Sequence, residues 1–266
     1  MTADPSSIVG IRYLNSRPLL AGLEAGIPAP FPYRFLTGDP SACADRLANG
    51  EAVAGLVPVA VLPVLPGVQM VADLGVACRQ EAGSVLLVSR VPLKRVTTLA
   101  AHAASRTSVV LARMLLAELW GASPRVTELR TPLDAFEGDC DAAVVIGDPA
   151  LELRGRTGFI EVDLGASWVE WTGLPFVFAV WGALPGAPSG VGELVEASYA
   201  YGIAHRDALL PHWAQGHGVT EEAARRYLQV TLHHRLGEAE HRAVNLFLVR
   251  AAAAGLLPHG PTSVTP

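Results

Sequence analysis

The stretch IVGIRYLNSRPLLAGLEAG, residues 8–26, joins an apolar run, a polar turn and an amphipathic pattern in one short segment. Its first part, 8–14, is rich in β-branched and other apolar residues and predicts a strand. Asn15 or Ser16 can cap a helix, and Pro18 suits the first turn of that helix. The segment therefore predicts a strand–turn–helix unit whose helix ends with the stretch.

Outside this stretch, short apolar runs continue to alternate with helical patterns. Strands are predicted at 31–36, 52–57, 69–74, 84–89, 126–129, 142–146, 159–162 and 174–183. Helices are predicted at 39–50, from 105–108 to about 121, and over most of 192–257. This alternation is typical of an α/β protein with mixed, mostly parallel sheets.

The length and the order of the elements predict two lobes. A chain of 266 residues exceeds the usual size of one domain. We expect the chain to cross between lobes at about Ser89 and to return through 174–183. This assigns 1–89 and 181–266 to a discontinuous first lobe and 90–180 to the second. Two crossings form a hinge, and a hinge lets a cleft close on a ligand.

The composition argues against several classes of partner. The formal net charge is -5, and Lys and Arg form no clustered stripe. We therefore expect no nucleic-acid partner and no attraction to an acidic membrane surface. The stretches 52–72 and 173–192 carry no charge and are long enough to span a bilayer. Each contains three prolines, which would break a membrane helix repeatedly, so both predict buried strands and turns instead.

The chain carries neither a disulfide framework nor a familiar cofactor motif. Its three cysteines are widely spaced and form no CxxC pair, which suits a reducing cytosol. The first residues lack the basic and apolar regions of a secretory signal, so we expect a cytoplasmic location. Phosphate-loop, dinucleotide, nucleophile-elbow and zinc-helix motifs are missing. We expect no cofactor and no metal, and we assign the histidines to solvated helix surface.

Polar residues gather where predicted strands meet predicted helices. They are Asn15, Ser16 and Arg17 in the first turn, Ser84 at the start of a strand, Thr107 and Ser108 at a helix start, and Gly147 and Asp148 after a strand. Clefts form at the carboxyl edge of a sheet, and a helix N-terminus attracts anions. The same residues are also good helix caps whatever the protein does. With one such helix end in each lobe, the pattern favours a small dicarboxylate ligand.

Five motifs occur in an order that resembles a known family. They are YLNS at 13–16 before Pro18, GSVLL at 83–87, RTSV at 106–109, VIGD at 145–148 and EWTGLPFVFA at 170–179. Together they resemble the chorismate dehydratase family of the futalosine pathway of menaquinone biosynthesis. The resemblance covers about 8–183.

This resemblance implies the two-lobed fold of type II periplasmic binding proteins, with a ligand cleft between the lobes. It implies conversion of chorismate to 3-(1-carboxyvinyloxy)benzoate and water without a cofactor. Asn15 is then the catalytic residue, and Thr107 and Ser108 bind a carboxylate.

The other residues of the matching motifs follow with less specific roles. Ser16, Ser84, Gly147 and Asp148 are expected to contact the substrate. Arg17 is expected either to pair with a carboxylate or to be a solvated first-turn residue. Trp171 is expected to be a core aromatic or, as the alternative, a wall of the cleft.

Two other functions stay open. One is a non-catalytic intracellular module of the same fold that binds a small carboxylate, although such modules normally carry an export signal. The other is the sister enzyme of the futalosine branch, which places a His-Glu pair where this chain has Gly147-Asp148. The oligomeric state, monomer or homodimer, is also open.

Overall fold

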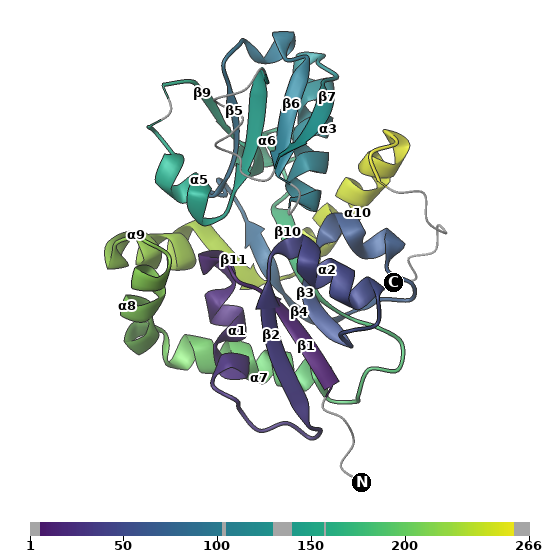
Figure 1. Cartoon of the computed structure of the whole chain (residues 1–266), viewed down its shortest axis with the longest axis vertical. Coiled ribbons are helices and arrows are strands. Elements are labelled where there is room, and N and C mark those ends of the chain that lie inside the picture. Colours follow the sequence, from purple (N-terminus) through teal and green to yellow (C-terminus); the bar gives the residue numbers. More distant parts are fainter. Residues whose placement is uncertain (1–5, 103–104, 130–139, 157, 258–266) are drawn as a thin grey trace.

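The structure is a computed structural model that describes residues 6–102, 105–129, 140–156 and 158–257. Two sheets, each flanked by helices, lie one above the other in Figure 1. The α/β architecture with two sheets agrees with the alternation of apolar runs and helical patterns in the sequence.

The lower sheet contains the first predicted strand of the chain. Its strand order is β11-β4-β10-β3-β1-β2. The strands are β1 (Ser6–Ile11), β2 (Tyr33–Gly38), β3 (Ala54–Pro58), β4 (Gln69–Cys78), β10 (Phe176–Ala183) and β11 (Leu232–Arg235). Strand β1 is parallel to β2 and β3, whereas β10 and β11 run antiparallel to their neighbours.

The upper sheet has the order β7-β6-β8-β5-β9. Its strands are β5 (Val85–Ser89), β6 (Thr98–His102), β7 (Arg125–Leu129), β8 (Ala142–Ile146) and β9 (Ile160–Asp163). Strand β6 is parallel to β7 and β8, and β5 is antiparallel to β8 and β9. Both sheets are therefore mixed, as expected, but parallel pairs do not predominate, because β5 and β10 run against the strands of the βα units in the sheets they join.

The two crossings lie earlier in the chain than the sequence suggested. Strand β5 pairs with strands of the upper sheet, whereas the expected boundary at Ser89 put it in the first lobe. Strand β10 pairs wholly within the lower sheet from Phe176, ahead of the expected return at 181. An apolar run predicts a strand but does not reveal its partner, so a boundary drawn from local pattern is displaced by one strand.

Helices and short turns connect the strands. They are α1 (Arg17–Glu24), α2 (Pro40–Ala48), α3 (Arg106–Trp120), α5 (Asp148–Leu153), α6 (Leu164–Thr172), α7 (Val191–Ala204), α8 (Arg206–Gly216), α9 (Glu221–Arg226) and α10 (Glu238–Ala253), with 3-10 turns η1 (Leu14–Ser16), η2 (Val59–Val64) and η3 (Leu93–Arg95). Pro18 lies in the first turn of α1, and Gly121 ends α3 with φ of 65°.

The C-terminal region was expected to be helical throughout, but the structure shows an exception. A π-helical turn, η4 (Tyr227–Thr231), leads into the edge strand β11. The sequence of β11 is four residues long and polar, so it carries no periodic strand signal.

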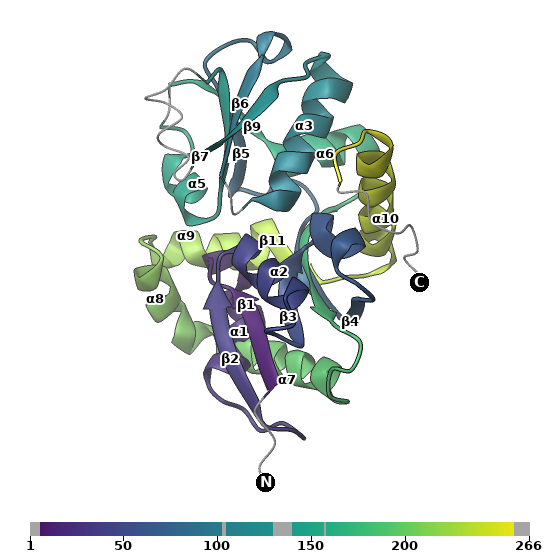
Figure 2. The ribbon, with the colours of Figure 1, turned by 45° about the vertical axis from the view of Figure 1, so that its right-hand side comes forward.

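The last helix packs against the second lobe as well as the first, whereas the closing helices were expected on the first lobe. In Figure 2, α10 lies beside α3 and α6. The rings of Trp168 in α6 and Phe247 in α10 are 6.1 Å apart, and both contact Phe176 at the start of β10. This buried aromatic cluster holds the two lobes together at the hinge.

A search of the described residues finds no helix that combines the length and the apolar character needed to cross a bilayer.

Candidate active site

A small cavity lies between the lobes, at the carboxyl ends of β1 and β8. The lower lobe, which contains the lower sheet, lines the cavity with Ile11, Tyr13, Asn15, Pro40, Pro58, Val76, Phe178 and Ala179. The upper lobe, which contains the upper sheet, lines it with Val85, Ser105, Arg106, Thr107, Ser108, Ile146 and Gly147. The volume of the cavity is about 50 Å³. That is room for very few water molecules, whereas sites for small molecules usually measure about 300–1,000 Å³. Side chains therefore fill most of the space between the lobes in this conformation.

Asn15 reaches this cavity from η1, directly after β1. Its backbone oxygen accepts a hydrogen bond of 2.7 Å from Nε2 of His234 in β11. Its side-chain oxygen Oδ1 is buried and has no hydrogen-bond partner among the described residues. A buried acceptor without a partner is unfavourable, so this oxygen is available to a donor on a ligand.

Ser84 and Tyr227 form a buried pair behind Asn15. The Tyr227 hydroxyl donates to Oγ of Ser84, and the backbone oxygen of Ser84 accepts from the Gly147 amide over 2.8 Å. Burial raises the pKa of Tyr227, so its hydroxyl stays protonated and remains a donor. Ser84 therefore supports the site from behind and is not one of the residues that line the cavity.

The N-terminus of α3 supplies the polar groups of the upper lobe. Oγ1 of Thr107 accepts from the Ala60 amide over 3.2 Å, a bond that joins the two lobes. Ser105 is buried, and in the part of the chain that the structure describes its Oγ has no hydrogen-bond partner and makes no capping bond. Ser105, Thr107 and Ser108, all in the first turn of α3 or directly before it, line the same wall of the cavity. Such a helix end favours a carboxylate.

Ser16 shapes the turn rather than the cavity. It is fully buried, and its Oγ donates to the backbone oxygen of Ile11 and, over 2.8 Å, to that of Tyr13. Neither bond caps α1. The predicted contact of Ser16 with a ligand is therefore not seen in this conformation, because both bonds hold its hydroxyl against the backbone of the turn.

Asp148 and Arg17, both expected at the ligand site, do not line the cavity. Each forms a hydrogen bond with the side chain of His217 instead. Asp148 accepts from the Leu14 amide over 3.1 Å and from Nδ1 of His217 over 2.6 Å. Nε of Arg17 donates to Nε2 of His217 over 2.8 Å, and its Nη1 pairs with Glu24 over 2.5 Å. These contacts join α5 of the upper lobe to η1 and to the end of α8.

Two sequence predictions are revised by this arrangement. The guanidinium of Arg17 binds His217 and Glu24, so it neither pairs with a carboxylate at the cavity nor lies free in solvent. The His217 side chain is only 6% exposed, which contradicts its assignment to solvated helix surface. The contact of Arg17 with His217 joins residues 200 positions apart, which no local pattern reveals.

Gly147 is needed where β8 turns into α5. Its φ of 68° and ψ of -146° lie in a region that only glycine adopts readily. A Cβ placed there would come within 3.0 Å of the Tyr13 ring. Burial and the nearby Asp39 raise the pKa of Tyr13 to about 12, so this cavity wall stays uncharged.

Trp171 does not line the cavity. Its ring lies 4.4 Å from the Arg250 guanidinium and packs edge-on against Trp168, between α6 and α10. The expected core role fits this placement.

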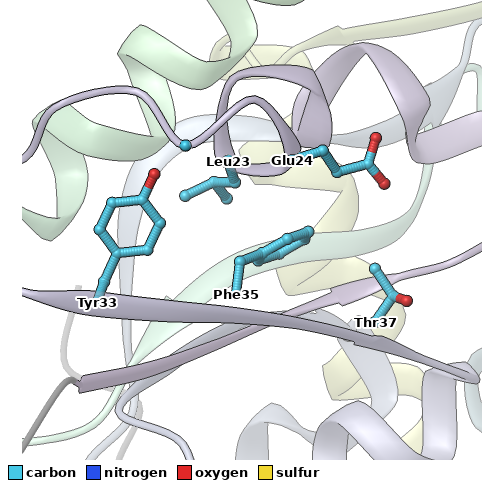
Figure 3. Close-up of a pocket in the computed structure, with 6 residues that line it drawn as sticks. Leu23, Glu24, Tyr33, Phe35 and Thr37 are labelled. Carbon is cyan, nitrogen blue, oxygen red and sulfur yellow. The ribbon is translucent and has the colours of Figure 1, made fainter.

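A second, shallower hollow lies elsewhere on the lower lobe. Figure 3 shows Tyr33, Phe35 and Thr37 pointing from β2 towards Leu23 and Glu24 at the end of α1. Its volume is about 560 Å³, but none of the site residues expected from the sequence lines it. The described residues also contain no group of three His, Cys, Asp or Glu side chains that could hold a metal.

The structure thus brings together Asn15, Thr107, Ser108 and Gly147 of the expected site residues around one cavity. It adds Ser105, Tyr227, His234 and His217, which the sequence reasoning missed as site residues. Of these, Ser105 carried a local signal, since it opens a predicted helix.

The sequence of this chain is similar to those of known proteins. A family model described as menaquinone biosynthesis matches residues 7–253. A protein of Thermus thermophilus named chorismate dehydratase is 31% identical over 189 residues, which cover 64% of this chain and 66% of that protein. A protein of the same name from Campylobacter jejuni is 28% identical over 44% of this chain and 52% of its own length. The chain therefore spans less than two thirds of the length of either relative.

Solved structures show the same fold. A crystal structure of a protein from Archaeoglobus fulgidus matches with a TM-score of 0.80 at 14% identity, over 97% of this chain and 100% of that one. The periplasmic aliphatic sulphonate binding protein SsuA of Escherichia coli matches with a TM-score of 0.64 at 17% identity, over 96% and 95%. The fold is therefore that of the periplasmic binding proteins.

Proposed function

The chain belongs to the menaquinone biosynthesis family, and from this premise we propose that it is a chorismate dehydratase, which removes water from chorismate to give 3-(1-carboxyvinyloxy)benzoate. The names of the Thermus and Campylobacter relatives support the reaction. The observation that carries the proposal is a pair of buried oxygens, Oδ1 of Asn15 and Oγ of Ser105, that lack a hydrogen-bond partner among the described residues and belong to side chains lining one cavity between the lobes.

The substrate matches the polar groups that surround the cavity. Chorismate carries two carboxylates and one hydroxyl. The N-terminus of α3, with Ser105, Thr107 and Ser108, is suited to one carboxylate. The unpartnered Oδ1 of Asn15 is suited to a hydroxyl donor. Apolar side chains such as Phe178 and Ile146 complete the wall against which the ring would lie.

The described residues that line the cavity offer no evident general base to the reaction. Among the described residues that line the cavity, the ionisable side chains are Tyr13 and Arg106. The raised pKa of Tyr13 keeps it protonated, and Arg106 pairs with Asp45 over 2.5 Å. We therefore assign the proton transfer to the substrate's own enolpyruvyl carboxylate, which Asn15 holds in position.

In this mechanism the C3–H bond breaks and its proton passes to that carboxylate. The electron pair spreads into the ring carboxylate, where donors on the wall of the cavity stabilise the charge. The C4–O bond then breaks, and the hydroxyl leaves with the proton as water. The ring becomes aromatic, which supplies the driving force without a cofactor.

Lobe movement and location complete the proposal. The predicted lobes were 1–89 with 181–266 and 90–180, and the strand pairing moves each boundary by one strand. These two lobes close on the substrate. A cytoplasmic location is part of the proposal because Cys43, Cys78 and Cys140 are free thiols, which suit a reducing compartment.

The test is to incubate the purified chain with chorismate and to follow aromatic absorbance together with the mass of the product. We expect a product lighter by one water that forms with the wild-type chain and not with Asn15→Ala. Binding of chorismate without turnover would favour the solute-binding alternative. If the chain neither bound nor converted chorismate, the proposal would be excluded.

A further inference from the structure

His217 lies at the C-terminal end of α8, outside the five motifs that resemble the dehydratase family. Its side chain is 6% exposed and forms hydrogen bonds with both Asp148 and Arg17. We propose that His217 is a positioning residue, which holds the Asp148 carboxylate of the upper lobe on the turn that carries Asn15. Its effect on the rate rests on the proposed function.

The direction of the hydrogen bonds fixes the state of the imidazole ring. A guanidinium group has only donors, so the bond of 2.8 Å from Nε of Arg17 requires a lone pair on Nε2 of His217. The proton of the ring is therefore on Nδ1, which donates it to Oδ2 of Asp148 over 2.6 Å. The ring is thus a neutral bridge that accepts on one side and donates on the other.

The guanidinium that determines this state is itself held in place. Nη1 of Arg17 pairs with Glu24 over 2.5 Å, and its Nη2 donates to the backbone oxygen of Arg12 over 3.2 Å. Because both terminal nitrogens are engaged, Nε is the donor that Arg17 directs to His217. Arg17 therefore presents a fixed donor to the ring and also ties the chain shortly before η1.

Asp148 uses its other oxygen to cap η1 from the opposite lobe. In the described part of the chain, the N-cap residue of η1, Tyr13, makes no capping bond with its side chain. The Leu14 amide, one of the first N–H groups of the turn, donates instead to Oδ1 of Asp148 over 3.1 Å. Figure 1 and Figure 2 both show α5, which begins at Asp148, at the edge of the upper lobe that faces α8 and α9. The cap therefore exists only while the lobes are together.

The turn that carries Asn15 is held at three of its backbone atoms. They are the oxygen of Arg12, the amide of Leu14 and the oxygen of Asn15, which bind Arg17, Asp148 and His234 in that order. Of these three bonds, the one to the Leu14 amide comes from the upper lobe, and His217 fixes the carboxylate that makes it. Asn15 is therefore fully aligned only when the upper lobe, with its carboxylate-binding helix end, is in place.

The first test compares His217→Leu with the matched control His241→Leu. His241 also bonds to an aspartate, Asp73, over 2.8 Å, but neither of these two is among the described residues that line the cavity. We expect His217→Leu to lower kcat by about 10²-fold, since misplacing a reacting group by about 1 Å costs this much. The KM should change little, because the groups at the start of α3 are untouched. The control should match the wild type, and an unchanged kcat in His217→Leu would overturn the inference.

His217→Gln shows whether hydrogen bonds rather than bulk carry the effect. A glutamine amide still offers one acceptor to Arg17 and one donor to Asp148. We therefore expect His217→Gln to recover most of the kcat that is lost in His217→Leu. A glutamine variant as slow as the leucine variant would contradict the role of the bridge.

A double variant separates positioning from general damage. In an Asn15→Ala background, His217→Leu is expected to have no further effect on the residual rate, because the group that it positions is gone. A further loss of the same size as in the wild-type background would show a role independent of Asn15, and the inference would be wrong.

A readout that does not depend on turnover is the exchange of the Leu14 amide hydrogen with water, measured by NMR. We expect faster exchange in His217→Leu than in the wild type, because the carboxylate that accepts from this amide is no longer fixed. In His241→Leu the exchange should stay as in the wild type. Equal exchange in His217→Leu and the wild type would overturn the inference. If the wild-type chain left chorismate unchanged, the proposed function would fail while this measurement still tested the bridge.

Should His217→Leu not fold, Asp148→Asn tests the same bonds from the other side. An asparagine in the same position has one acceptor and one donor end, so it cannot accept from both the Leu14 amide and Nδ1 of His217. We expect either faster exchange at Leu14 or a move of the ring proton of His217 to Nε2, which the nitrogen chemical shifts of the ring report. Wild-type exchange together with a proton on Nδ1 would overturn the inference.

Discussion

Nε2 of His234 lies 2.7 Å from the backbone oxygen of Asn15, although the two residues are 219 positions apart in the chain. The contact fastens the short edge strand β11 to the turn that follows β1. The residue on which the proposed chemistry depends is thus supported by the last quarter of the chain. Variants in that quarter should therefore change the site as well as the fold.

The buried histidine predicts a specific loss of stability in acid. The pKa of His234 is about 4 in the folded chain, below the value of about 6.5 for a free histidine. The unfolded chain therefore binds a proton between these values while the folded chain does not, so stability falls as the pH drops from about 6.5 to about 4 and levels off below. The contribution is about 2 kcal/mol between pH 7 and pH 5.

Urea unfolding at both pH values checks this effect against His234→Gln, which can still donate to Asn15 but does not titrate. We expect the wild type to lose about 2 kcal/mol more than the variant over this range. An equal loss in the two proteins would show that His234 is protonated in the folded chain.

Ser105→Ala is expected to separate binding from stability. Its Oγ is buried and finds no partner within the described residues, so its removal should leave the free energy of unfolding unchanged or raise it by up to about 1 kcal/mol. The KM for chorismate should rise about tenfold, since a hydrogen bond to a carboxylate is lost. Ser89→Ala is the reverse control, because its Oγ donates to the Val91 oxygen over 2.7 Å. It should lower stability and leave KM unchanged.

Asn15→Asp places a negative charge beside a twice-negative substrate. We expect kcat to fall by on the order of 10²-fold or more, as on loss of a preorganised polar group in an active site. Asn49→Asp adds the same charge at the exposed end of α2 and should retain the wild-type rate. Steady-state kinetics with chorismate measures both, and a fully active Asn15→Asp would refute the positioning role.

Asp148 is expected to hold the lobes closed. It accepts from the Leu14 amide and from His217 across the interface, and its side chain is 24% exposed. Asp148→Asn should lower the free energy of unfolding by about 1–3 kcal/mol and increase the radius of gyration in X-ray scattering. Asp45→Asn breaks the exposed pair with Arg106 and should cost less than about 1 kcal/mol. If Asp148→Asn kept the radius of gyration of the wild type, Asp148 would not be the residue that holds the lobes closed.

Gly147→Ala is expected to damage both fold and site. The backbone there is unfavourable for alanine by about 1–3 kcal/mol, and the added Cβ would press on the Tyr13 ring, a wall of the cavity. Gly121→Ala is the matched control, with φ of 65° and open space around the added atom. It should cost about 1 kcal/mol and leave kcat unchanged. Thermal unfolding and kinetics of the two variants test the difference.

Much of the fold follows from local features of the sequence. The strand, turn and helix around Asn15, the helix that starts near Ser105 and the turn at Gly147 are each specified by apolar periodicity, proline or glycine within a few residues. Polar residues at the ends of such strands meet at one edge of a sheet, which is why Asn15, Thr107, Ser108 and Gly147 could be expected at one cleft.

Only the tertiary structure decided which distant segments support that cleft. Tyr227, His217 and His234 act through contacts that span 143, 200 and 219 positions, and no periodic pattern encodes such a pairing. The same holds for the antiparallel partners of β5 and β10 and for the polar strand β11. Local propensity acts between neighbours in the chain, whereas these contacts form only once packing of the lobes has brought remote side chains together.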